Sequence, residues 1–285
     1  MAFELKVLLE SALIPASVTL AFAVVAWLLE ARLPATFIAG MVVVGWWLGL
    51  MAGHTGIVPW AWWSDEHWQR LPFPLLITGL LLGPSAACCK NAPWRLLAMG
   101  SLACLTGWIV IPHDEAWKDM WPEQSAWMAL LVSSSLWNHW SMEDLLDRQG
   151  SRWGIWILVS ALAAVLILAA ASYATMAQWV LAALSATFAI AFLGIFRPSL
   201  PVKAITPCVC LVIASMLAWS RFRGELKPMW LYAAILFSPT IIALADRLAE
   251  KRVPYWGRVA LAATLASSLL VIVIIDAMGS GHEDW

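Results

Sequence analysis

Long apolar stretches separated by short clusters of charged residues dominate this chain of 285 residues. A helix needs about 20 apolar residues to cross the roughly 30 Å hydrocarbon core of a bilayer. Nine stretches between charge clusters suit that length, and eight of them each accommodate one helix. The ninth, residues 153–196, contains no charged residue and would form about 66 Å of helix at about 1.5 Å per residue. Because that is twice the core, we expect the chain to fold back near Ser172, Tyr173 and Thr175.

The pattern therefore predicts an all-α protein, a polytopic transmembrane helical bundle of about ten transmembrane helices. The loops are short, so we expect a single integral membrane domain over residues 1–285 with no soluble domain. The predicted spans are approximately 11–29, 35–53, 72–89, 95–112, 124–140, 153–172, 176–196, 203–220, 228–245 and 256–276.

Composition supports this class and excludes others. Hydrophobic residues make up 62% of the chain and charged residues 12%, whereas soluble domains carry about 25% charged residues. The 17 Lys and Arg against 18 Asp and Glu lack the basic excess of a nucleic-acid-binding protein. We therefore expect the lipid bilayer as the main partner and no nucleic acid.

The distribution of Lys and Arg predicts the orientation, because positive residues accumulate in short cytoplasmic loops. With ten spans, one side holds six: Lys6, Arg70, Lys118, Arg221, Arg223 and Lys227. The other holds eleven: Arg32, Lys90, Arg95, Arg148, Arg152, Arg197, Lys203, Arg247, Lys251, Arg252 and Arg258. A single helix over residues 153–196 would change the division to nine against eight, which gives no orientation. We therefore expect ten spans, with both termini on the outer, periplasmic or extracellular, side of a bacterial cytoplasmic membrane.

The 21 tryptophans mostly fall near predicted helix ends. Indoles prefer the headgroup level of a bilayer, so two aromatic belts are the simplest interpretation. The outer segment 59–68 is dense enough in tryptophan to suggest a ligand platform instead. Its composition resembles the tryptophan-rich outer loop of haem-handling proteins of cytochrome c assembly, although the spacing differs and no family is assigned.

The predicted outer loops also carry the densest group of potential metal or haem ligands. Imidazole and carboxylate groups bind divalent cations, and haem iron takes axial imidazole. Neither loop has a recognised zinc or calcium spacing, so ordinary polar loops remain the alternative and the cofactor stays unknown. The candidate residues are His54, Asp65, His67, His113, Asp114 and Glu115.

Within the predicted spans, no Asp, Glu, Lys or Arg lies near the middle, which disfavours a carboxylate-driven pump. The polar groups there are hydroxyls and amides, and an internal proline frees a backbone carbonyl that can line a polar path. Plain helix kinks are the alternative. The candidate pathway residues are Ser133, Ser134, Asn138, Ser238, Pro239 and Thr240.

Small residues four apart predict close helix packing. Gly45, Gly49 and Gly53 form one such ladder, which suits either a neighbouring helix or a homo-oligomer. Residues 260, 264 and 268 form another.

Function is less constrained than architecture. The chain has no P-loop, nucleophile elbow or Rossmann fingerprint, and we find no catalytic motif to indicate an enzyme. The best hypothesis is a transporter or facilitator of a small solute. The alternative is a structural or assembly subunit of a membrane complex with protein partners, which handles haem or metal at the outer face.

Overall fold

The computed structural model describes residues 6–57, 67–88, 93–112, 120–149, 152–197, 199–223 and 227–279, and these residues contain helices and no strand. The long helices are α2 (Ile14–Leu29), α3 (Ala35–Ile57), α4 (Pro72–Cys88), α5 (Pro93–Val110), α6 (Trp121–Gln149), α7 (Ile155–Ser172), α8 (Ala174–Phe196), α9 (Thr206–Arg223), α10 (Met229–Ala249) and α11 (Tyr255–Gly279). Short helical turns accompany them: η1 (Leu9–Leu13), η2 (His67–Arg70), η4 (Arg152–Gly154) and η5 (Val202–Ile205).

The expected helical bundle is confirmed, and each predicted span overlaps one of these helices. The break expected within residues 153–196 lies at Tyr173, between the end of α7 and the start of α8. Tyr173 has φ −160° and ψ 110°, an extended conformation open to any residue. The turn therefore requires neither glycine nor proline, which explains their absence from this stretch.

Helix α6 differs most from its predicted range. The helix extends to Gln149, about two turns beyond residue 140, where we placed the end of the span. The extra turns carry Glu143, Asp144 and Asp147, and each of these carboxylates pairs with a basic side chain from another element. The charged residues that end the apolar stretch therefore do not end the helix, which runs through them to Gln149.

Seven helical segments are long and apolar enough to cross a membrane, within the part of the chain that the structure describes: 6–29, 35–53, 93–110, 174–196, 202–222, 229–249 and 255–278. Helices α4 and α7 contain shorter apolar segments. Helix α6 is the longest of the ten but is more polar than the others.

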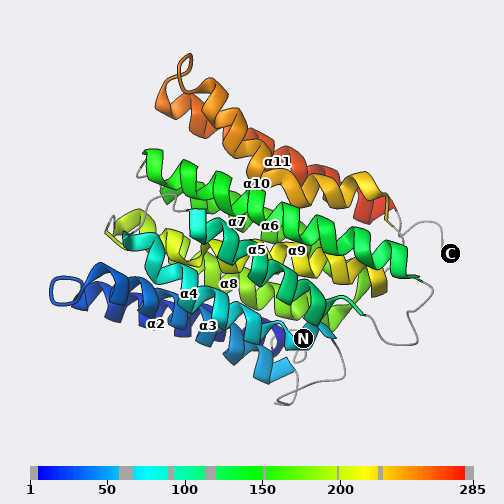
Figure 1. Ribbon diagram of the computed structural model, residues 1–285, viewed down its shortest axis with the longest axis horizontal. Helices are drawn as coiled ribbons and strands as arrows, with labels where there is room; N and C mark the ends of the chain where they lie inside the picture. The colour runs from blue at the N-terminus through cyan, green and yellow to red at the C-terminus, as the bar shows by residue number, and fades with distance from the viewer. Residues whose placement is uncertain are drawn as a thin grey trace.

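Helix α9 forms the axis of the bundle. Its side chains are almost all buried, and α4, α5, α6, α7, α8 and α10 contact it. Helices α2, with α3, and α11 lie on opposite outer sides of the bundle (Figure 1). Helix α11 contacts α7 and α10 and exposes most of its surface.

The glycine ladder of α3 packs inside this chain. A Cβ on Gly45 would lie 2.3 Å from the Cβ of Phe22, and one on Gly49 would lie 2.6 Å from the backbone oxygen of Pro15. A Cβ on Gly53 would lie 2.7 Å from that of Ala182. Glycine lets α2 and α8 approach the backbone of α3, so this ladder is an intrachain contact.

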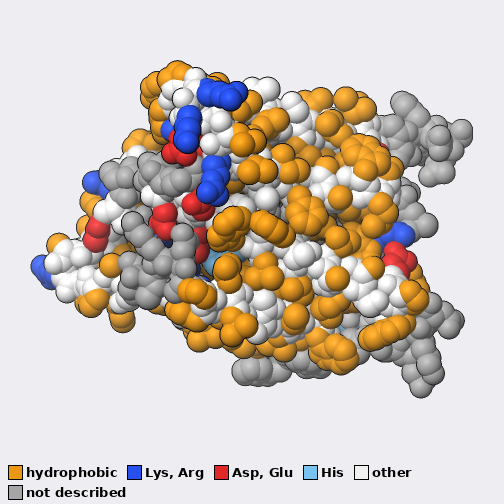
Figure 2. Space-filling model, turned by 45° about the horizontal axis from the view of Figure 1, so that its top comes forward, with side chains coloured by type: hydrophobic (Ala, Val, Ile, Leu, Met, Phe, Trp, Pro, Cys, Tyr) orange, Lys and Arg blue, Asp and Glu red, His pale blue; other side chains and the backbone are white. Residues whose placement is uncertain are grey.

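Charged side chains gather toward the two ends of the molecule, and apolar side chains cover the middle of the face shown in Figure 2. Helix α2 begins and α11 ends at the same end of the bundle (Figure 1).

Ion pairs join residues assigned to the same side by sequence. On the predicted outer side they are Lys6–Glu10, Arg221–Glu123 and Lys227–Asp276. On the predicted inner side they are Arg95–Glu143, Lys203–Asp147, Arg247–Asp144 and Arg258–Asp246.

Candidate functional site

The clearest polar site inside the bundle is the junction between α6 and α10. The buried Asn138 of α6 donates from Nδ2 to the carbonyl oxygen of Leu236, 2.6 Å away. Its Oδ1 accepts from the backbone N–H of Thr240 at 3.2 Å and from the Thr240 hydroxyl at 2.8 Å. Leu236 and Thr240 are four residues apart, the spacing at which backbone groups normally bond each other in an α-helix. The Asn138 carboxamide therefore binds the Leu236 carbonyl oxygen and the Thr240 N–H, two backbone groups that normally bond each other in a helix.

Pro239 explains why α10 needs additional partners at this point. Proline has no N–H, so the carbonyl of Ile235, four residues earlier, lacks its usual helical donor. The buried Ser238 hydroxyl donates to that carbonyl oxygen at 2.9 Å. The Ser238 hydroxyl and the Asn138 carboxamide thus satisfy backbone groups of α10 around Pro239. The helix continues through the proline with these partners.

The structure brings together four of the six candidate pathway residues: Asn138, Ser238, Pro239 and Thr240. Ser133 and Ser134 lie about one turn earlier on α6. Their hydroxyls bond the carbonyl oxygens of Leu130 and Leu131 in the same helix, at 3.2 and 3.3 Å.

One turn beyond Asn138, α6 carries a buried ion pair that sequence reasoning missed. The Arg95 guanidinium of α5 donates to the Glu143 carboxylate, and both side chains are almost fully buried. The buried His139 places Nε2 3.6 Å from Glu143 Oε2. A buried ion pair needs good geometry to offset its desolvation, and Arg95 also reaches the carbonyl oxygen of Leu82 at 3.4 Å.

Further ion pairs surround this one and join the same end of the bundle. Lys203 of η5 lies 2.6 Å from Asp147, and Arg247 of α10 lies 4.0 Å from Asp144. The sequence signal for this cluster was the acidic group 143, 144 and 147 at the end of an apolar stretch. We interpreted those residues as the boundary of an apolar stretch and not as an ion-pair cluster.

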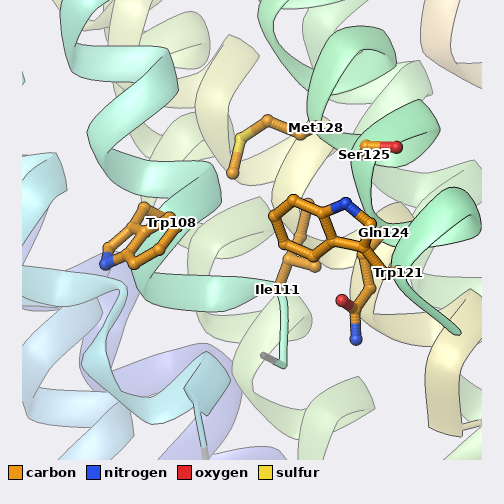
Figure 3. Close-up of a pocket in the computed structure, with 6 residues that line it drawn as sticks. All are labelled: Trp108, Ile111, Trp121, Gln124, Ser125 and Met128. Atoms are coloured by element: carbon orange, nitrogen blue, oxygen red, sulfur yellow. The ribbon is translucent and has the colours of Figure 1, made fainter. Parts of the chain in front are cut away.

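A pocket lies at the opposite end of α6, between the end of α5 and the start of α6. It has a volume of about 220 Å³ and is lined by Trp108, Ile111, Trp121, Gln124, Ser125 and Met128. The Trp108 and Trp121 rings flank the pocket, with Met128 toward one end and the Gln124 side chain toward the other (Figure 3). Its lining is mostly apolar, so it suits an apolar or aromatic group.

The candidate metal and haem ligands fall mostly outside the described residues. Asp65, His113, Asp114 and Glu115 are among those not described, and His54 lies in α3 with its side chain outside the description. His67 is buried, its Nδ1 is 3.3 Å from the Ile109 carbonyl oxygen, and its ring centroid is 6.1 Å from that of Trp219. The described part of the chain contains no group of three or more His, Cys, Asp or Glu able to hold a metal ion.

Comparison of the chain with protein-family models, curated proteins and solved structures finds no match.

Proposed function

We propose that the protein is an integral membrane protein whose ten long helices all cross the bilayer, with both termini on the outer side of a bacterial cytoplasmic membrane. The apolar middle, the charged ends and the same-side ion pairs support this arrangement. Helices α4 and α7 have 17 and 18 residues, about 26 Å of helix. That length is slightly short of the core, and modest local thinning of the bilayer accommodates it.

We further propose that the protein carries or facilitates the passage of a small polar solute. The observation that carries this proposal is the Asn138 carboxamide bound across the proline-containing segment of α10. A proline inside a membrane helix frees backbone polar groups near the bilayer interior, where transporter sites use such groups together with polar side chains. The hydroxyls and the amide here are uncharged, so they suit a neutral polar solute.

The inner charged end supports the same proposal. Basic groups from α5, η5 and α10 converge on the acidic residues of α6. Such pairs hold the inner ends of these helices together, and their separation would open a path toward the inner surface. Helix α6 carries both Asn138 of the polar junction and the carboxylates of these ion pairs, so it connects the two regions.

The test is flux through proteoliposomes that contain the purified protein. We would impose gradients of glycerol, urea and alanine in turn, and follow vesicle volume by stopped-flow light scattering. We expect faster flux of at least one solute than in empty vesicles, and loss of that increase with Thr240→Ala. Ser160→Ala is the matched control, because among the described residues the Ser160 hydroxyl of α7 bonds the carbonyl oxygen of Ile157 in its own helix. Flux equal to that of empty vesicles for all three solutes contradicts the proposal.

The alternative, a structural or assembly subunit of a membrane complex, is favoured by one specific observation. Ala260, Thr264 and Ser268 are exposed on α11, whereas small residues at this spacing usually mark helix–helix contacts. Native mass spectrometry of the protein purified from gently solubilised membranes tests this function. A stoichiometric complex with other membrane proteins would favour the subunit over the independent transporter, and bound haem or metal would support the outer-face site.

A further inference from the structure

A groove between α6 and α10 opens on the surface of the bundle near its charged end. The lining residues are Trp137, Trp140, Ser141 and Asp144 on α6, and Thr240, Ala243, Leu244 and Arg247 on α10. On each helix these positions recur at three, four and seven residues, so each set forms one helical face two turns long.

The groove changes from apolar to charged along its length. Asn138 contacts Thr240, and six to seven residues later Asp144 pairs with Arg247. The two helices therefore run in the same direction, and the groove covers about 10 Å of helix. Trp137 lies near the first end of the groove, and the charged pair lies at the other. This gradient matches an amphiphile that lies along the helices.

Among the lining residues of the groove, the charged end combines Arg247 and Asp144. Arg247 Nη1 is 4.0 Å from Asp144 Oδ2, which is beyond hydrogen-bonding distance. The Arg247 side chain is 56% exposed, so its guanidinium donors are accessible to a ligand. Arg247 and Asp144 carry opposite charges, so together they complement the phosphate and the ammonium of a zwitterion.

The aromatic part of the groove is also accessible. Trp137 and Trp140 are exposed by 51% and 37%, and their rings make an edge-on contact with centroids 5.5 Å apart. Exposed indoles favour the headgroup level of a bilayer, where an apolar ring meets a polar environment. The neighbouring Leu244 is 53% exposed and adds apolar surface beside them.

We propose that this groove binds a zwitterionic phospholipid with a primary amine, such as phosphatidylethanolamine. Arg247 donates to the phosphate, since a guanidinium matches phosphate geometry. The ammonium donates to the Asp144 carboxylate, and the glycerol and upper acyl chain lie along Trp137, Trp140 and Leu244. A quaternary choline has no N–H to donate, so the carboxylate selects the primary amine. This inference rests on the proposed membrane location of the protein.

Native mass spectrometry of the full-length protein in detergent tests the site. The protein is mixed in turn with phosphatidylethanolamine, phosphatidylcholine and phosphatidylglycerol that carry the same acyl chains. We expect preferential retention of phosphatidylethanolamine, and about a tenfold weaker association with Arg247→Gln, the loss of roughly one charge-assisted contact. Arg252→Gln is the matched control, because Arg252 is exposed in the turn after α10 and lies outside the groove.

A second pair of variants keeps the test valid if Arg247→Gln does not fold. Trp140→Leu should weaken phosphatidylethanolamine binding, whereas Trp256→Leu, which changes an exposed tryptophan on α11, should not. Equal retention of phosphatidylethanolamine and phosphatidylcholine by the unaltered protein overturns the proposal. Equal effects of groove and control variants also overturn it. The assay requires no solute flux, so a protein that binds this lipid but moves no solute would contradict only the transport proposal.

Discussion

At the scale of single residues, buried polar side chains on α6 hold neighbouring helices in place. Asn138 binds backbone groups of α10, and Glu143 binds Arg95 of α5. A buried donor or acceptor that loses its partner costs about 1–3 kcal/mol, and a buried charge costs more. These contacts join segments about 50 to 100 residues apart, so each of them constrains the packing of the bundle.

Asn138→Ala should destabilise the protein by about 1–3 kcal/mol, because it leaves the Leu236 carbonyl and the Thr240 amide without their side-chain partner. Ser133→Ala is the control on the same helix, since the hydroxyl of the half-buried Ser133 bonds the Leu130 carbonyl of α6 and no other helix in the described part of the chain. Thermal unfolding in detergent measures both. Equal melting temperatures for the two variants would show that the junction contributes no stability.

Glu143→Leu and Arg95→Met should each destabilise the protein strongly, by about 3–5 kcal/mol, because each leaves one buried charge without its partner. The double variant should lose much less than the sum of the two single losses, since it removes both charges. A double-mutant cycle from unfolding measurements gives the coupling energy. Additivity within about 0.5 kcal/mol would mean that the two groups do not interact.

At the scale of elements, the length of apolar stretches was enough to locate the helices. It also located the break at Tyr173, because no single helix of the length of residues 153–196 matches a bilayer. Spacing within the chain does not say which helices become neighbours. The Arg95–Glu143 pair, 48 residues apart, therefore could not be predicted.

Two other errors have the same origin. Trp127 lies near a predicted helix end, so the aromatic-belt interpretation places it at the outer headgroup level. The structure buries it against Tyr232 of α10, with the ring centroids 5.5 Å apart, because this face of α6 is covered by its neighbours. The ladder at 260, 264 and 268 was expected to pack within the bundle, but α11 is a peripheral helix and exposes it. Residue type predicts that a contact is favourable, whereas the fold decides which faces meet.

The contact between α2 and α3 gives a test at this scale. Gly49→Ala should destabilise the protein by about 1–3 kcal/mol, because the new Cβ would meet the Pro15 backbone oxygen at 2.6 Å and force the helices apart. Gly40→Ala on the same helix is the control, since the nearest atom to its new Cβ is 3.8 Å away. Thermal unfolding distinguishes them. A variant at position 49 as stable as the one at position 40 would contradict the close packing.

At the scale of the whole molecule, α2 begins and α11 ends at the same end of the bundle (Figure 1), and charged side chains gather toward both ends (Figure 2). The predicted spans place each charged residue on one side, and the ion pairs named above join residues of the same side. Sidedness is a property of insertion, which the fold of the chain does not determine. The direct test is therefore made in intact cells.

The decisive measurement is cysteine labelling from outside the cell in a variant without native cysteines. Single cysteines replace Arg32, Met229 and Lys251, three exposed residues next to helix ends. A membrane-impermeant maleimide should label position 229 on intact cells, and positions 32 and 251 only after permeabilisation. Labelling of position 251 but not 229, with position 32 still protected, would mean that residues 153–196 cross once, and would contradict the ten-span arrangement. Labelling of positions 32 and 251 but not 229 would reverse the proposed orientation.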